Sequence, residues 1–358
     1  MRRRVIRGAL QLAFAVGALA VFFWRVDTGE VFAQLRTVDL RWAIFALLAF
    51  TASKVLHSWR WWQFLGQPAA PIRSLAGVFL VSNMANSLLP LRAGDFLRVE
   101  VPAKRFGIPR SLLASSVFVV ESVLDLFAFA ILMVVALLLS DLPVVLRPLV
   151  GLVGGTAVVL FGAIVVLVRS RDVVESWLGR TLRALPDRIS MPIESRLPDF
   201  VDGMSSLRTN MDAARVVGIS LVAWIVEVGV YFLLAKAFGL DLNVPQALIL
   251  MIAANLIVSL PITPWSIGPY ELAVTEALVA IGAERTEAGA FALGSHLMLQ
   301  AWIVLTGILA MLWIGLGPRD LWPGSREDRE AIRLAESERD PETDAKQPAR
   351  ASDSPPQP

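Results

Sequence analysis

The sequence predicts an all-α polytopic integral membrane protein with about six spanning helices and two re-entrant broken-helix hairpins that form an inverted repeat. Of its 358 residues 56% are hydrophobic, and the mean hydropathy is +0.62, whereas a soluble domain has about 45–50% apolar residues. Several apolar runs exceed the ~18 residues that indicate a membrane span. Two others are interrupted by proline and glycine, and a membrane tolerates a broken helix only inside protein or beside water.

The composition also excludes several classes of function. A net charge of +2 is too small to favour nucleic-acid binding, and the lack of cysteine excludes disulfides, thiolate catalysis and sulfur-ligated metals. The two histidines, His57 and His296, are far apart in the chain, so we expect no metal site and no cofactor. Ser266 does not lie in a Gly-x-Ser-x-Gly elbow, and no phosphate-binding glycine loop occurs, so we expect no enzymatic activity.

The first two predicted spans are residues 8–24 and 42–64. Arginines before the first span put the N-terminus in the cytoplasm by the positive-inside rule, and the second span returns there. Trp59, Trp61 and Trp62 at its end are typical of an aromatic belt at the inner membrane interface.

A basic segment identifies the first broken hairpin. A short apolar run carries Asn83 and Asn86 and stops at Pro90. Residues 92–110 then contain more basic than acidic side chains, which is typical of a cytoplasmic segment. We therefore expect residues 75–101 to enter the membrane from the cytoplasm and to return to it.

The longest apolar run carries two carboxyl groups. Glu121 and Asp125 are four residues apart and share one face of a helix. A charge at the centre of a spanning helix costs about 2.5–3.5 kcal/mol on insertion scales. These groups, and Glu227 in a later span, must therefore face the bundle interior, be protonated or form pairs, for instance with Lys54 or Arg98. The alternative for Lys54 is a side chain that snorkels to the interface.

The remaining segments complete the predicted topology. Residues 169–212 form a cytoplasmic amphipathic loop, and the next span crosses outward. The second broken hairpin, residues 251–276, enters from outside, and a last span returns to the cytoplasm. Residues 1–317 thus form one transmembrane domain, and residues 318–358 form a polar, largely disordered cytoplasmic tail.

The order of span, broken hairpin and span occurs twice, at residues 42–139 and 213–314. Because the hairpins enter from opposite sides, the halves form an inverted repeat, which in transporters places a binding site between the halves near the midplane. The residues expected to shape the two breaks are Asn86, Pro90, Gly94, Pro261, Pro264 and Gly268.

Three short motifs resemble those of one family. PLRAGDFLR contains an Arg-x-Gly-Glu-x-x-Arg element with Asp95 in the place of glutamate, and ESVLD resembles a Glu-Arg-x-x-Asp element with Ser122 in the place of arginine. LPITPWSIGPYE resembles a Pro-x-x-Pro-Gly-Gly-x-Gly-x-x-Glu element with Trp265 and Ser266 in the places of two glycines. Over residues 8–316 the chain resembles the lysylphosphatidylglycerol synthase transmembrane-region family, also called the flippase-like or UPF0104 family.

The resemblance implies lipid translocation, best established where the domain flips an aminoacylated phospholipid. Other members are tied to polyprenyl-linked glycan pathways. No soluble aminoacyl-transferase domain follows the membrane region, so we expect the synthase activity itself to be absent.

We therefore interpret the chain as a flippase of the cytoplasmic membrane that moves a phospholipid or a polyprenyl-phosphate-linked lipid. The residues expected to bind the substrate are Arg92, Asp95, Arg98, Glu121, Asp125, Glu227, Asn255 and Glu271. Arginine forks suit the lipid phosphate. For Glu271 the alternative is helix capping, and for the asparagines it is hydrogen bonding between helices.

The expected partners are membrane lipids and, in the second hypothesis, a cell-envelope or lipid-modifying enzyme. In that hypothesis the chain is a non-transporting membrane scaffold for the enzyme. A third, weaker hypothesis is an integral membrane transferase that acts on a lipid-linked sugar.

Overall fold

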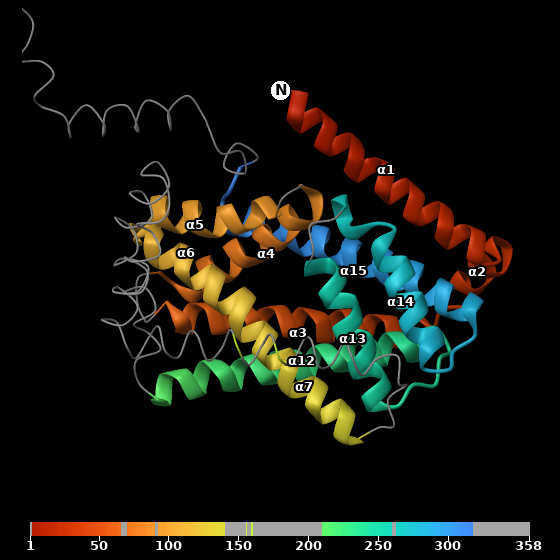
Figure 1. The fold of residues 1–358 in the computed structure, drawn as a ribbon. Coiled ribbons are helices and arrows are strands. Elements are labelled where there is room, and N and C mark those ends of the chain that lie inside the picture. The colour runs from red at the N-terminus through yellow and green to blue at the C-terminus, as the bar shows by residue number, and fades with distance from the viewer. Residues whose placement is uncertain are drawn as a thin grey trace, which may run out of the picture. The chain divides into compact units, whose positions relative to one another are not determined.

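The computed structural model describes residues 2–65, 70–89, 92–139, 155, 159, 210–259 and 263–317, and the elements within them are helices (Figure 1). The elements are α1 (Arg2–Arg25), α2 (Thr28–Leu35), α3 (Leu40–Phe64), α4 (Ile72–Leu88), α5 (Ala93–Phe106), α6 (Arg110–Phe118), the π-helix η2 (Val119–Leu124), α7 (Asp125–Leu139), α12 (Asn210–Ala237), α13 (Val244–Ser259), the 3₁₀-helix η5 (Pro264–Ser266), α14 (Pro269–Ala280) and α15 (Arg285–Ile314). Met1–Gly315 form one compact unit. The predicted tail, and the predicted amphipathic loop up to the start of α12, lie outside the described residues.

Three helices in the described part of the chain are long and apolar enough to cross a membrane. They are α3, Ala214–Ala237 within α12, and α15, and shorter apolar stretches lie in α1, α7 and α13. Large apolar side chains on these helices are exposed, such as Phe45 on α3, Val222 on α12 and Leu309 on α15. The helical class predicted from hydropathy is confirmed, and exposed apolar surface of this kind agrees with contact to lipid.

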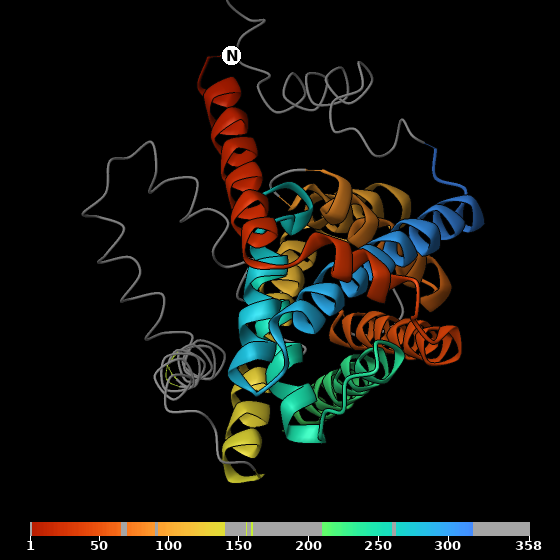
Figure 2. The ribbon, with the colours of Figure 1, turned by 90° about the vertical axis from the view of Figure 1, so that its right-hand side faces the viewer.

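The helices α3 and α12 lie side by side and run in opposite directions (Figures 1 and 2). At one end the Asp39 backbone N–H donates to the carbonyl oxygen of Ala237 at 2.9 Å. Toward the other end the Arg60 guanidinium (Nη1) donates to the Ser220 hydroxyl at 2.9 Å. Because Asp39 precedes α3 and Ala237 ends α12, the two helices are antiparallel.

The two predicted halves share one hydrophobic core. α4 packs along α15, α13 packs against α7, α12 and α14, and α14 packs on α15. The largest cluster of buried apolar residues takes members from α3, α7, α12, α13, α14 and α15, with Leu234, Leu250 and Phe291 fully buried. Helices of each predicted half therefore pack on helices of the other half.

The helix at the first predicted break ends with α4 and restarts with α5. Leu89 is extended, and Arg92 takes a left-handed conformation with φ +54° just before α5. A side chain on Gly94 would not fit, because a Cβ there would lie 1.9 Å from the carbonyl oxygen of Ser82 in α4. The break predicted from Pro90 is therefore present, although Pro90 itself lies outside the described residues.

The second break separates α13 from α14 and contains three residues with positive φ. Trp265 and Ser266 have φ +58° and +55°, and Gly268 has φ +91°. A Cβ on Gly268 would lie 2.6 Å from the Cβ of Ala18, so α1 packs closely against this break. Glycine at 268 therefore provides both the backbone conformation and the space that the break needs.

The contact between Gly94 and α4 generates a testable prediction. Gly94→Ala should lower the melting temperature of the purified protein in detergent, because overpacking a close contact costs about 1–3 kcal/mol. The matched control is Gly218→Ala in α12, where a Cβ would meet nothing within 4 Å and alanine is the better helix former. Equal melting temperatures for the two variants would show that the α4–α5 contact is not tight.

Candidate functional site

A cavity of ≈ 430 Å³ lies where the two helix breaks meet α3, α7, α12 and α15. Asn86 and Arg92 at the first break and Thr263, Trp265 and Ser266 at the second all contribute to its wall. Among the described residues, its ionisable lining side chains are Lys54, His57, Arg92, Asp125, Glu227, Tyr231, Tyr270 and His296. A polar cavity of this size inside an apolar helical bundle is the natural place to look for a binding site.

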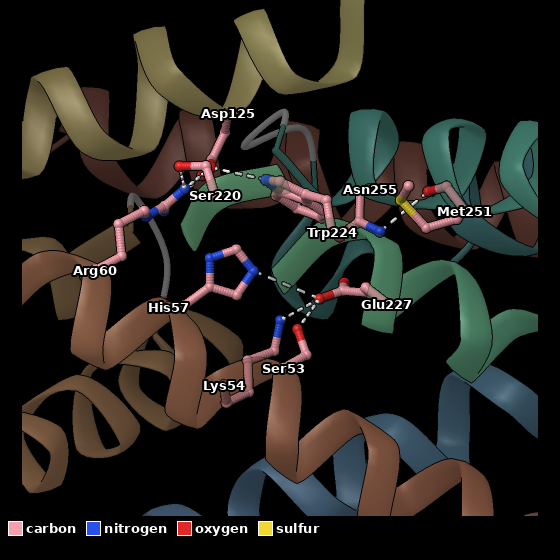
Figure 3. Close-up of polar contacts among 10 residues, drawn as sticks. All are labelled: Ser53, Lys54, His57, Arg60, Asp125, Ser220, Trp224, Glu227, Met251 and Asn255. Carbon is pink, nitrogen blue, oxygen red and sulfur yellow. Dashed lines mark hydrogen bonds and ion pairs between the residues drawn. The ribbon is translucent and has the colours of Figure 1, made fainter. Parts of the chain in front are cut away.

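Glu227 of α12 is buried in the cavity wall and has three polar partners on α3 (Figure 3). Its carboxylate accepts hydrogen bonds from the Ser53 hydroxyl at 2.7 Å and from the Lys54 amine at 3.1 Å. His57 Nε2 lies 3.8 Å from the same oxygen. Pairing and snorkelling were the two alternatives for Lys54. Its side chain is paired and only 18% exposed.

A second buried ion pair joins α3 to α7. The Arg60 guanidinium donates through both terminal nitrogens to the carboxylate of Asp125, and Nη1 also reaches Ser220 (Figure 3). The indole N–H of Trp224 donates to the same carboxylate at 2.9 Å. Arg60 is fully buried, so its charge is stabilised by this partner and not by water.

Helical spacing explains why these groups meet. Lys54, His57 and Arg60 lie three residues apart on α3 and share one face, as do Ser220, Trp224 and Glu227 on α12 in Figure 3. Since α3 and α12 are antiparallel, Lys54 meets Glu227 while Arg60 meets Ser220 and, beyond it, Asp125. The ring of His57 fills the space between the two pairs and packs edge-on against Trp224, with 4.9 Å between ring centroids.

At the first break the structure groups three predicted residues. Asp95, in the first turn of α5, accepts hydrogen bonds from Arg92 Nε and from the side-chain amide of Asn86, both at 2.9 Å. Arg92 and Asn86 line the cavity, whereas Asp95 lies behind them and holds them. The carboxylate also lies at a helix N-terminus, where negative charge is favourable.

Arg98 does not line the cavity. It is 2% exposed, and its guanidinium lies between the rings of Trp61 and Phe79, 4.6 Å from each centroid. Trp61, expected in an interfacial belt, is itself fully buried and donates to the hydroxyl of Ser116 at 2.9 Å. The structure thus places Arg98 in a cation–π sandwich between α3 and α4.

At the second break Glu271 lies behind the cavity wall. Its carboxylate accepts the backbone N–H of Gly268 at 2.6 Å, as expected for capping of α14, and contacts His296 Nδ1 at 2.6 Å. The ring of His296 lines the cavity and stacks on Tyr270 with 4.1 Å between ring centroids. Glu271 therefore orients a cavity-lining imidazole and does not itself face the cavity.

The other predicted residues divide into two groups. Asn255 lines the cavity, and its amide donates to the carbonyl oxygen of Met251, one turn back on α13, at 3.0 Å (Figure 3). Glu121 belongs to η2, but its side chain lies outside the described part of the structure. The side chain of Pro264 and all of Pro261 also lie outside it.

Comparison with known proteins decides the family. Residues 8–307 match the family described as lysylphosphatidylglycerol synthase TM region. The chain belongs to this family. The resemblance predicted from the three short motifs is therefore confirmed, and with it the location of the chain in a membrane.

The relatives that this chain is similar to differ in length. The chain is 27% identical to a protein of Haloferax volcanii named glycosyltransferase AglD. The match covers 84% of this chain but 53% of that protein, so this chain spans about half the relative's length. It is 24% identical to a UPF0104 membrane protein of Methanothermobacter thermautotrophicus, over 80% of this chain and 86% of the relative. A second protein of that name from the same organism is 25% identical over 74% and 83% of the two chains.

At the second break this chain departs from the glycines that the family resemblance predicts. The motif has two glycines where this chain has Trp265 and Ser266, and both positions adopt the positive φ that favours glycine. A non-glycine residue there costs of order 1–3 kcal/mol. In return the chain gains a cavity-lining indole, since Trp265 is 40% exposed and lies in the cavity wall.

Sequence reasoning missed Arg60 altogether and did not place His57 or His296 in the substrate site. Arg60 lies inside the tryptophan-rich segment that ends α3, where an arginine is typical of an interface. The signal that could have found it is the three-residue spacing from Lys54 through His57. Its buried position depends on the pairing of α3 with α12 and α7, which no local pattern predicts.

The Arg60–Asp125 pair generates a second prediction. Arg60→Met should lower the free energy of unfolding in detergent by about 3–5 kcal/mol, because it leaves a buried carboxylate without its partner. The double variant Arg60→Met/Asp125→Leu should recover most of that loss. As a control, Arg110→Met breaks an exposed pair with Glu100 and should cost at most about 1 kcal/mol. The account of this pair fails if Arg60→Met is as mild as the control.

Proposed function

We propose that this protein is a flippase that moves a phospholipid or a polyprenyl-phosphate-linked lipid across the cytoplasmic membrane. The observation that carries the proposal is the cavity, where two helix breaks and paired charges meet inside an apolar bundle. A lipid headgroup needs a polar path through the ~30 Å hydrocarbon core, whereas its tails can stay in the bilayer. Such transport needs no covalent step and no cofactor.

The proposal includes about six spans and two re-entrant hairpins in an inverted repeat. Reciprocal packing of the corresponding elements supports it. The first helices of the two halves, α3 and α12, pair with each other, while α4 packs along α15 and α13 packs against α7. In each half, therefore, the first arm of the hairpin packs on the last helix of the other half. A pseudo-twofold axis in the membrane plane produces this relationship.

The proposed orientation has both termini in the cytoplasm. Arg25 and Arg285 are both predicted near the outer face, and they donate to Glu276 at 2.8 and 2.7 Å. These guanidinium groups, with Arg285 contributing most, hold the pKa of Glu276 below its usual value. At the other end of α15, Arg105 from the basic segment donates to the carbonyl oxygen of Ile314 at 2.5 Å. Segments expected on the same side of the membrane thus meet at each end of α15, which supports the topology, while the orientation rests on the positive-inside rule.

Lys54 and Arg92 are the cavity-lining groups that we propose for the lipid phosphate. Each has a carboxylate partner, Glu227 and Asp95 respectively, and a phosphate can take the place of such a partner because charge-assisted hydrogen bonds to cations are strong. Lys54 is better placed for this role than Arg98, which lies away from the cavity. The carboxylates of Asp125 and Glu227 would then keep the cavity close to neutral.

A second candidate function is a non-transporting membrane scaffold for a lipid-modifying or cell-envelope enzyme. The observation that favours it is the Haloferax relative, which is named a glycosyltransferase and is about twice as long as the part that this chain matches. In that case the present domain would hold the lipid while a partner acts on it.

Reconstitution distinguishes the two candidates. We expect the purified protein in liposomes to bring a fluorescent phospholipid or a labelled polyprenyl phosphate from the inner to the outer leaflet, measured by quenching of the outer-leaflet label. Lys54→Met/Glu227→Gln, which removes both charges of the pair, should slow transport about tenfold or more, since one charged hydrogen bond contributes about 1.5–3 kcal/mol.

The matched control for that variant is Arg110→Gln on the exposed surface, which should transport at the parent rate. If the parent protein moves none of these lipids, with or without a pH gradient, the scaffold function is favoured. If the double variant and the control transport equally fast, the cavity is not the path.

A further inference from the structure

The two helix breaks are joined by a chain of hydrogen bonds that runs through α15. At the first break, the Ser87 hydroxyl donates to the side-chain oxygen of Gln300 at 2.8 Å. The amide nitrogen of Gln300 lies 3.3 Å from the carbonyl oxygen of Trp265, in the second break. One side chain of α15 therefore contacts both breaks.

His296 extends this chain to α14. Its Nε2 lies 3.3 Å from the Gln300 amide nitrogen, and its Nδ1 lies 2.6 Å from Glu271, which also accepts the backbone N–H of Gly268. His296 and Gln300 are four residues apart, on one face of α15. Because an amide nitrogen can only donate, Nε2 is the acceptor, and the Nδ1–H then donates to the carboxylate.

The direction of donation is the same along the whole chain. Ser87 donates to Gln300, Gln300 donates to His296, and His296 donates to Glu271, where the chain ends on a carboxylate that caps α14. Ser295, next to His296, is within 3.4 Å of the hydroxyl of Tyr270, which adds a further contact between α15 and α14. A continuous network of this kind is stronger than its separate members and favours one arrangement of both ends.

We propose that Gln300 and His296 are positioning residues that tie the two breaks together, so that the cavity walls formed by each break shift as one unit. The inference rests on the proposed flippase function, because the breaks must rearrange when a headgroup passes. α15 lies between α4 and α14 and packs on both, so it can transmit the state of one break to the other. Coupling needs such a physical connection between two sites.

Cysteine reactivity tests the coupling directly, because the chain has no cysteine of its own. Trp265→Cys serves as the reporter: the side chain is 40% exposed, and its contact with Gln300 uses only the backbone carbonyl. The rate of maleimide labelling is measured on the full-length protein in detergent. Ser87→Ala, on the other break, should raise that rate about fivefold, as expected when one hydrogen bond is lost from a coupled network.

Three further variants in the reporter background sharpen the test. Gln300→Leu should raise the rate at least as much, and Ser87→Thr, which keeps the hydroxyl, should restore the parent rate. Thr306→Val is the matched control: within the described part of the chain that hydroxyl donates to carbonyls of its own helix, so its loss should leave the rate unchanged. If Gln300→Leu does not fold, judged by its melting curve, the two Ser87 variants decide the question.

Two results would overturn the inference. In the first, Ser87→Ala leaves the labelling rate at position 265 unchanged, which means that Gln300 stabilises each break locally and does not couple them. In the second, Thr306→Val raises the rate as much as Ser87→Ala, which indicates general loosening. Failure of the flippase proposal is distinguishable, because labelling requires no lipid transport. A protein that moves no lipid but gives the expected rates retains the coupling and loses the function.

Discussion

A charged side chain inside an apolar helical bundle is stable only with a partner, and this constraint fixes the centre of the structure. α3 carries Lys54 and Arg60, and their carboxylate partners lie on α12 and α7. A one-residue slip of α3 against α12 would separate Lys54 from Glu227 and Arg60 from Ser220 at once, because these contacts lie on the same face of α3. The register of these helices, the separation of the two breaks and the shape of the cavity all depend on this pairing.

The helix breaks impose a second constraint, which the protein meets with local devices. Backbone groups released by a break need partners wherever water is scarce. Asp95 holds Asn86 and Arg92 at the first break, and Glu271 receives the backbone of Gly268 at the second. Each restarting helix thus carries an acidic residue in its first turn, which binds side chains at the first break and a backbone N–H at the second. The motifs predicted an acidic residue after each break, but not the groups that it binds.

The sequence predicted the helical class, the two breaks and the family because each leaves a local signal. Hydropathy marks the apolar helices, Pro90 and Pro261 mark the breaks, and short motifs mark the family. Arg98 matched a motif and was expected at the lipid phosphate, but it lies between Trp61 and Phe79. Packing between helices decides which rings surround a guanidinium. The spacing of residues within one helix does not predict it.

The candidate site shows the same division. Asp125, Glu227, Asn255 and Arg92 were expected to bind the substrate because polar residues in apolar runs and beside a helix break are visible in the sequence, and the structure places all four in the cavity wall. Lys54 was named only as one possible partner of the carboxylates, and neither Arg60, the partner of Asp125, nor His296, the partner of Glu271, was assigned in advance. Each partner lies on another helix, and its identity depends on the packing of α3 against α12 and α7 or of α15 against α14.

The central claim is that a lipid headgroup enters the cavity while the tails stay outside the bundle. Photo-crosslinking tests it most directly, with a diazirine analogue of leucine at Leu256, which lines the cavity, or at Leu309, which is 55% exposed on α15. Mass spectrometry of the lipid adducts then identifies which part of the lipid was attached. The account predicts headgroup adducts at 256 and acyl-chain adducts at 309. Acyl-chain adducts at both positions, or none at 256, would contradict it.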